Sequence, residues 1–202
     1  MRNDYFFHRV DGVTVLFADI EGFYDIADQR ADVWMKRLND FFTYFDTMTD
    51  MYRIEKIKTI GDAYMCAGGI LRKNHPAQVV LMALEVQNHL RQQRRLDADT
   101  WFIRIGIHTG AVYAGMLGMK KLSYDIWGHT VNFASRIEAL CPSDKIHISG
   151  DTYEQVKQYF ICEYCGQIPE RIGMGCSYYV KGLKPEYSVK TLREKMEAEF
   201  EK

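Results

Sequence analysis

The chain has 202 residues, of which 47% are hydrophobic and 26% are charged, as is typical of a soluble protein with one substantial core. Its formal net charge of −1 gives no indication of binding to nucleic acid or to an anionic membrane surface. No apolar run is long enough to span a membrane, and no signal peptide is recognisable. We therefore expect a cytoplasmic protein, or the cytoplasmic domain of a longer protein that is itself membrane-bound.

The five cysteines are an odd and scattered set, which favours a reducing compartment with free thiols. Cys162 and Cys165 have the spacing of half a zinc site, but the sequence offers no matching second pair. Two thiols on an alternating strand are the favoured interpretation.

In chain order, we expect a lead-in segment over residues 1–12, a domain over residues 13–192 and a charged C-terminal segment over residues 193–202, which is predicted as a solvated helix or tail. Hydrophobic periodicity and turn residues place the elements of the domain. The first half has a strand over 13–18, a helix around 34–48, a hairpin over 54–69, a helix within 74–96 and a strand–turn–strand over 101–117. The turn of this last unit is expected at Thr109-Gly110. The second half has an extended segment over 121–127, a helix over 128–140, a strand over 144–149, a short helix over 150–158 and further strands over 160–192.

The order β-α-β-β-α-β at the front is that of a split βαβ unit. The predicted fold class is therefore α+β, with a ferredoxin-like βαββαβ core, an antiparallel-rich sheet, flanking helices and a C-terminal β subdomain. Topology alone does not assign a function.

Two acidic residues far apart in the sequence are expected to meet at one end of this sheet. Asp19 follows the first buried strand, and Asp62 lies in the Gly61-Asp62 turn of the hairpin. If the second strand of the hairpin pairs beside the first strand, the two carboxylates become neighbours and need a cation. Oxygen ligands without a cysteine or histidine cluster suit Mg²⁺ or Mn²⁺. The alternative is that Asp19 caps a helix and Asp62 belongs only to the turn.

A second pair of polar residues lies on the helix predicted over residues 128–140. Asn132 and Arg136 are four residues apart, so their side chains share one face of that helix. An amide beside a guanidinium suits a phosphate or ribose–phosphate group. The alternative is a surface asparagine and an arginine paired with a nearby acid such as Glu138.

Four stretches resemble the motifs of class III nucleotidyl cyclase catalytic domains. They are FADIEGF (17–23), KIKTIGDAYM (56–65), RIGIHTG (104–110) and YDIWGHTVNFASR (124–136). The resemblance extends from about residue 13 to residue 192, and motifs of this length in this order are far more specific than a short pattern. It implies the nucleotidyl cyclase fold and the conversion of a nucleoside triphosphate into a 3′,5′-cyclic nucleotide and pyrophosphate.

The resemblance also implies roles for individual residues in binding metals and phosphates. Asp19 and Asp62, with the backbone carbonyl of Ile20, match the residues that bind two metal ions, Mg²⁺ or Mn²⁺. Asn132 and Arg136 match the pair that positions the ribose and stabilises charge on the α-phosphate. Two more cations match residues that contact the triphosphate, namely Arg104 and Lys181.

The residues that match the purine-reading positions of the family are Lys58 and Asp125. Adenine presents an acceptor at N1 and a donor at N6, whereas lysine only donates and a carboxylate only accepts. The pair is therefore complementary to adenine, and a guanylyl cyclase of this type carries glutamate and cysteine instead. The sequence predicts specificity for ATP.

Members of the family form head-to-tail dimers with active sites shared between chains. Because this chain carries both sets of residues, the resemblance implies a homodimer, and an upstream sensor domain in a longer protein. Two alternatives are a guanylyl or dual-specificity cyclase, and a catalytically silent module for dimerisation or nucleotide sensing. The second alternative is expected to lack one of the matched residues, and all are present.

Overall fold

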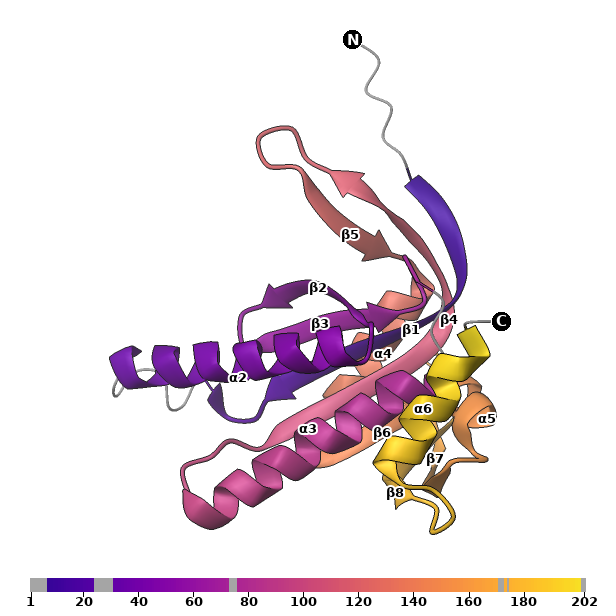
Figure 1. Ribbon diagram of the computed structural model, residues 1–202. Helices are drawn as coiled ribbons and strands as arrows, with labels where there is room; N and C mark the ends of the chain where they lie inside the picture. The colour runs from indigo at the N-terminus through magenta and orange to yellow at the C-terminus, as the bar shows by residue number, and fades with distance from the viewer. Residues whose placement is uncertain (1–6, 24–30, 73–75, 171–172, 174, 201–202) are drawn as a thin grey trace.

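The computed structural model describes residues 7–23, 31–72, 76–170, 173 and 175–200 (Figure 1). The strands are β1 (Phe7–Ile20), β2 (Glu55–Ile60), β3 (Ala63–Gly68), β4 (Ile103–Leu117), β5 (Ser123–Trp127), β6 (Lys145–Ser149), β7 (Phe160–Gln167) and β8 (Cys176–Leu183). The helices are α2 (Ala31–Met51), α3 (Pro76–Leu96), α4 (His129–Ala139), α5 (Gly150–Val156) and α6 (Val189–Phe200). None of the helices in the described part of the chain is long and apolar enough to cross a membrane.

The strands form one mixed sheet in the order β2-β3-β1-β4-β6-β8-β7, and β5 pairs with β4 outside this row. Within the described residues, β4 and β6 run parallel and the other paired strands are antiparallel. The first elements, β1-α2-β2-β3-α3-β4, form the expected split βαβ unit with β1 and β3 adjacent. The predicted α+β fold class is confirmed.

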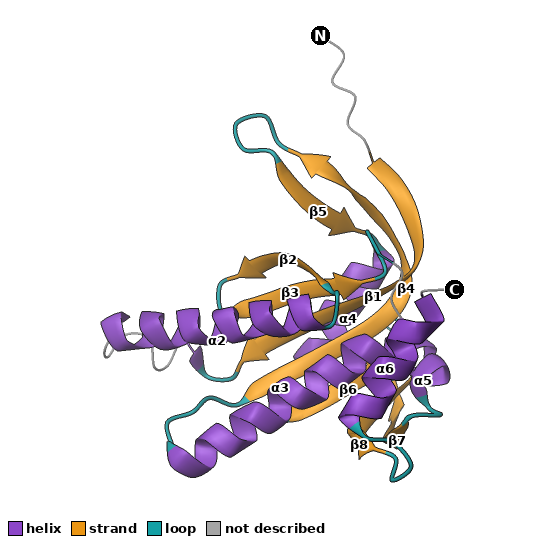
Figure 2. Cartoon of the chain, in the orientation of Figure 1, coloured by secondary structure: helices purple, strands orange, loops and turns teal. Residues whose placement is uncertain are grey.

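Helices pack on both faces of the sheet (Figure 2). The larger core lies between the sheet and helices α2, α3 and α6, and includes Leu16, Phe45, Leu81, Ile105 and Met196. A smaller core around Val15, Met65, Val112 and Ala134 lies on the side of α4. Each fully buried Val, Leu, Ile, Phe or Met side chain contributes about 1.5–3 kcal/mol, so the smaller core helps to hold α4 against the strands.

The bend predicted at Thr109-Gly110 is wrong. Strand β4 continues from Ile103 to Leu117 without a turn, and Gly110 pairs with Val13 in β1. A Cβ atom added to Gly110 would lie 2.6 Å from the hydroxyl oxygen of Thr130 in α4. The glycine therefore leaves room for helix α4 to pack on the strand. From the sequence alone, a glycine with this role cannot be distinguished from a glycine in a turn.

Two other boundaries differ from the sequence prediction. Strand β1 begins at Phe7, inside the expected lead-in segment, because its first residues pair with the distal half of β4. Helix α6 replaces the end of the predicted strand region and continues through residues 193–200, where a helix was one of the two expected forms. It packs through Leu192 and Met196, whose side chains are fully buried.

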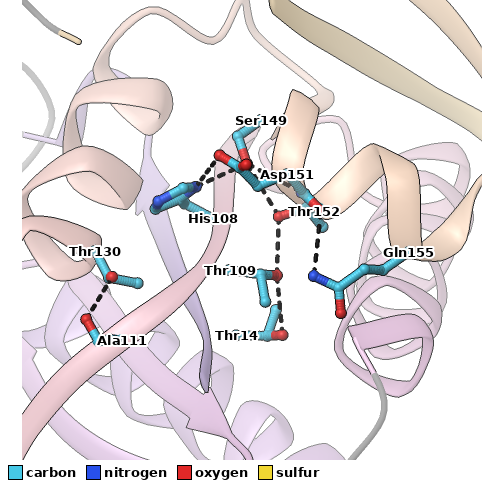
Figure 3. A network of polar contacts seen from close by, with 9 residues as sticks. All are labelled: Thr14, His108, Thr109, Ala111, Thr130, Ser149, Asp151, Thr152 and Gln155. Carbon is cyan, nitrogen blue, oxygen red and sulfur yellow. Dashed lines mark hydrogen bonds and ion pairs between the residues drawn. The ribbon is translucent and has the colours of Figure 1, made fainter. Parts of the chain in front are cut away.

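A network of buried polar side chains connects β1, β4, β6 and α5 (Figure 3). The hydroxyl groups of Thr14 and Thr109 lie 3.0 Å apart, and Thr109 continues to Thr152 at 3.0 Å and from there to Ser149 at 3.1 Å. Nδ1 of His108 lies 2.8 Å from the Ser149 hydroxyl, and burial lowers the pKa of this histidine to about 4. Its ring is therefore neutral at physiological pH, and the network is structural.

The distal ends of β1, β4 and β5 form an arm that projects beyond the helices (Figure 1). We define this arm as residues 7–10 and 111–127. It carries large apolar side chains that are exposed in the single chain, namely Phe7, Tyr113, Met116, Leu117, Met119 and Leu122. Clustered exposed apolar surface of this kind is typical of an interaction site.

Candidate active site

The end of β1 and the β2–β3 turn bring Asp19 and Asp62 together. Pairing of Ala18 with Tyr64 places the turn beside the last residues of β1, and Gly61 in the turn has a φ of 63° that favours glycine. Asp62 is only 5% exposed. Burial, the charge of Asp19 and a hydrogen bond between the two carboxyl groups all raise the pKa of Asp62.

Arg104 joins this pair from the neighbouring strand. It lies directly opposite Asp19 in the β1–β4 register, and its Nη2 atom donates to the Asp19 carboxylate. Its Nε atom lies 3.2 Å from Oε1 of Glu138 in α4. We refer to Asp19, Asp62, Arg104 and Glu138 as the carboxylate cluster, in which the guanidinium group contacts Asp19 and Glu138, and Asp62 contacts Asp19.

Glu138 was not predicted as a site residue, since the sequence suggested it only as a partner of Arg136. It lies on the buried face of α4 next to Ile137, and burial together with the charge of Asp19 raises its pKa to about 7. An acid adjacent to the apolar stripe of an amphipathic helix is the signal in the sequence that could have identified it.

Close packing of α4 on β4 fixes the position of Glu138. A Cβ atom added to Gly106 would lie 2.2 Å from the backbone nitrogen of Glu138, so only glycine allows this approach. The backbone oxygen of Ile137 lies 3.1 Å from Nδ1 of His147 in β6. The C-terminal half of α4 is therefore held against two strands of the sheet.

Asn132 and Arg136 lie one turn apart on the opposite, exposed side of α4. Phe133, Ala134 and Ile137 bury the other side of the helix against the sheet. The structure therefore presents the amide and the guanidinium group to the outside of the single chain, where both side chains are accessible to a ligand or to another chain.

Lys58 and Asp125 form an ion pair between β2 and β5. Nζ of Lys58 lies 2.5 Å from Oδ2 of Asp125, and Oδ1 of Asp125 accepts a hydrogen bond from the backbone nitrogen of Ile126 at 2.9 Å. The aspartate side chain is 15% exposed and the lysine side chain 40%. Among the described residues, no hydrogen bond or ion pair connects this pair to the carboxylate cluster.

Lys181 does not join the other site residues within the chain. It lies on β8, and its Nζ atom is 2.5 Å from Oε2 of Glu163 on the neighbouring strand β7. Both side chains are about half exposed, at 49% and 55%. The ammonium group therefore lies near the surface and is paired with Glu163.

The half zinc site suggested by Cys162 and Cys165 finds no support among the residues that the structure describes. All five cysteines are free, and within the described ranges none of them belongs to a group of three or more histidine, cysteine, aspartate or glutamate side chains that could hold a metal ion. Burial raises the pKa of Cys162 to about 11, as expected of an unreactive thiol.

Comparisons with known proteins identify the family. The sequence model of the adenylate and guanylate cyclase catalytic domain matches residues 6–182. Adenylate cyclase type 9 from Gallus gallus is 34% identical over 180 residues, which cover 87% of this chain and 13% of that protein. The chain thus spans a small part of the length of this relative.

Solved structures agree with this result. The guanylate cyclase domain of RhGC from Catenaria anguillulae, in complex with GTP, superposes with a TM-score of 0.82 and 30% identity, covering 88% of this chain and 100% of that one. The adenylyl cyclase CyaB from P. aeruginosa gives a TM-score of 0.82 and 28% identity, covering 91% and 100%. The chain belongs to the class III adenylyl and guanylyl cyclase catalytic domain family.

Proposed function

We propose that the chain is an adenylyl cyclase, which converts ATP into 3′,5′-cyclic AMP and pyrophosphate at two equivalent sites of a homodimer. The family includes both adenylyl and guanylyl cyclases. The choice of ATP rests on one observation, the ion pair between Lys58 and Asp125.

This pair offers one donor and one acceptor at a fixed separation. In the proposed complex, the ammonium group of Lys58 donates to N1 of adenine and the carboxylate of Asp125 accepts from the N6 amino group. Guanine presents the reverse pattern, so it would leave the ammonium and carboxylate groups without partners in the complex, and this mismatch is what gives discrimination.

The carboxylate cluster fits a site for divalent metal ions. Asp19 and Asp62 present oxygen ligands, and burial together with the charge of Asp19 raises the pKa of Asp62. We assign these two carboxylates, with the backbone carbonyl of Ile20, to holding two Mg²⁺ or Mn²⁺ ions beside the triphosphate. When bound, such ions supply Lewis-acid stabilisation of the attacking and leaving oxygens of an in-line displacement.

The reaction itself needs no nucleophile from the protein. The ribose 3′-oxygen forms a bond to the α-phosphorus, the bond from that phosphorus to the bridging oxygen of pyrophosphate breaks, and the hydroxyl proton is lost to a base or to solvent. Asn132 orients the ribose, and Arg136 stabilises the charge that develops on the α-phosphate. Arg104 and Lys181 neutralise the remaining phosphates.

Two features support the proposed homodimer. The exposed Asn132–Arg136 face lies on the side of α4 away from Glu138, and no hydrogen bond or ion pair among the described residues joins the Lys58–Asp125 pair to the carboxylate cluster. We therefore assign these residues to a site that a second chain completes. The arm carries exposed apolar side chains, of which Met119 is 87% exposed and Leu122 64%. Burial of such surface between two chains provides the driving force for association.

The test is a turnover assay with ATP and with GTP, each with Mg²⁺ and with Mn²⁺, over a range of protein concentrations. We expect cyclic AMP as the main product, with a rate that increases faster than linearly with protein concentration in dilute samples. Faster turnover of GTP would overturn the assignment of the substrate. A specific activity that is constant down to the lowest concentration, in a protein shown to be monomeric there, would overturn the shared site.

A further inference from the structure

Glu138 is a buried acid to which the proposed reaction gives no role. The residue is only 9% exposed, and a charged side chain is rarely buried to this extent without a partner. Its partner in the structure is Arg104, whose Nε atom lies 3.2 Å from Oε1 of Glu138. The second contact of that guanidinium group is with Asp19.

Arg104 is therefore held by two carboxylates from two different elements. Asp19 approaches from β1, where it is also assigned to holding metal ions, and Glu138 approaches from α4. Whenever the oxygens of Asp19 are engaged elsewhere, Glu138 is the acid that still contacts Arg104. A guanidinium group has five N–H donors in a rigid plane, so a carboxylate on its Nε side leaves other donors free for a phosphate.

The backbone that carries Glu138 is fixed independently of its side chain. Gly106 allows α4 to lie directly on β4, and Ile137, the preceding residue, is fully buried. The carboxylate of Glu138 thus occupies a defined position relative to β4, the strand that carries Arg104. Such a fixed support is what a functional side chain needs to keep a productive orientation.

We propose that Glu138 is a positioning residue, which holds the guanidinium group of Arg104 in the orientation that binds the triphosphate. The inference rests on the proposed function, since Arg104 acts on the phosphates only in that reaction. The ion pair between Arg104 and Glu138 supplies the orientation, and Asp19 is left available for its own role.

The test measures binding and turnover for Glu138→Gln, Arg104→Ala and the double variant. Glutamine keeps the size of the side chain and removes its charge. We expect the Kd for inorganic tripolyphosphate and for a non-reactive ATP analogue to increase about tenfold in Glu138→Gln, in line with the loss of a buried ion pair that orients a phosphate-binding group. The KM for ATP should increase with the Kd.

The double-mutant cycle separates positioning from a structural role. In the Arg104→Ala background, Glu138→Gln should change the Kd less than twofold, because the group that it orients is absent. An equal loss of affinity in both backgrounds would contradict the proposal, and so would an unchanged Kd in the single variant. Glu154→Gln is the matched control, since Glu154 forms an exposed ion pair with Lys157 and should leave every parameter unchanged.

A second variant covers the case in which Glu138→Gln is poorly folded, as judged by its melting temperature. Glu138→Asp keeps the charge but withdraws it from Arg104, so it should also increase the Kd for tripolyphosphate, and wild-type affinity in a folded Glu138→Asp protein would contradict the proposal. Failure of the proposed function has a different signature, because wild-type protein would then neither bind the ATP analogue nor produce cyclic AMP.

Discussion

Asp62 and Glu138 are acids that the fold buries close to Asp19, and each has a pKa above its ordinary value. For Glu138 the pKa is raised to about 7, with burial as the largest cause. As the pH rises, the unfolded chain loses these protons first, while the folded chain retains them until its own higher pKa values are reached. Stability is therefore greatest below the ordinary pKa values and falls as the pH increases.

The free energy of unfolding of the protein, measured in a chelating buffer, should therefore decrease between about pH 5 and pH 7.5. Glu138 should account for on the order of 3 kcal/mol of this decrease in the free energy of unfolding. Urea titrations at several pH values would measure it. Glu138→Gln should show a smaller slope with pH, and an identical slope would mean that another group titrates in this range.

The choice of base is also a property of single residues. Lys58→Glu combined with Asp125→Cys should shift the ratio of kcat/KM for ATP and GTP towards GTP by about tenfold or more, because the donor and acceptor positions are exchanged. The measurement is turnover with each nucleotide. A matched exchange of the ion pair Lys56–Asp46, which lies outside the proposed site, should leave the ratio unchanged. An unchanged ratio in the first variant would show that other residues read the base.

At the scale of residues, the sequence predicted those contacts between side chains that follow from short spacings along the chain and from the order of the strands. Asp19 and Asp62 could be expected to meet because a hairpin beside a buried strand leaves few alternatives. Glu138 could not be found in the same way, since its contact with Arg104 depends on how closely α4 approaches β4. That distance is set by the absent side chain of Gly106, and a glycine in a sequence does not reveal which element it accommodates.

At the scale of elements, the packing of α4 on β4 is the feature on which the proposed site depends. Gly106→Ala should force helix α4 away from strand β4, since the added Cβ atom would lie 2.2 Å from the backbone nitrogen of Glu138. We expect a loss of about 3 kcal/mol in the free energy of unfolding, together with a large decrease in turnover. Denaturant titration and activity assays would measure both.

Gly166→Ala provides a comparison for this substitution. A Cβ atom at Gly166 has no neighbour within 4 Å, although the φ of 119° makes alanine unfavourable there. This variant should lose stability through backbone strain alone and retain its turnover. If Gly106→Ala behaved in the same way, the close approach of α4 would not be important for the reaction.

Element types were predictable wherever periodicity and turn chemistry agreed. The hairpin of β2 and β3 follows from alternating side chains around Gly61-Asp62, and α3 follows from its apolar face after Pro76. The prediction failed at Thr109-Gly110 because a glycine in the middle of a strand resembles a turn. It also missed the start of β1 at Phe7, because pairing with β4 is a long-range contact that local sequence does not specify.

At the scale of the whole molecule, the proposed dimer predicts complementation between two inactive chains. Asp62→Asn removes the metal-binding half of a site, and Asn132→Ala removes the ribose-binding half. In an equal mixture, about half of the dimers should contain one chain of each variant. Such a heterodimer has one intact site out of two, so activity should return to about a quarter of the wild-type value. Mixing followed by a turnover assay measures it.

Disruption of the arm is the control for this experiment. Leu122→Lys in both chains should weaken association, as followed by sedimentation velocity, and should abolish the recovery. If two inactive variants failed to complement while forming mixed dimers, each site would have to be built from a single chain.

Helix α4 carries Asn132 and Arg136 on one side and Glu138 on the other, within 11 residues. In the proposed dimer, these two sides of α4 belong to different active sites, and the helix connects the two sites as a rigid element. A shift of Arg104 at one centre would then be passed through α4 to the ribose contacts at the other. Nucleotide titrations of the dimer should therefore reveal crosstalk, with the second equivalent bound at an affinity different from the first.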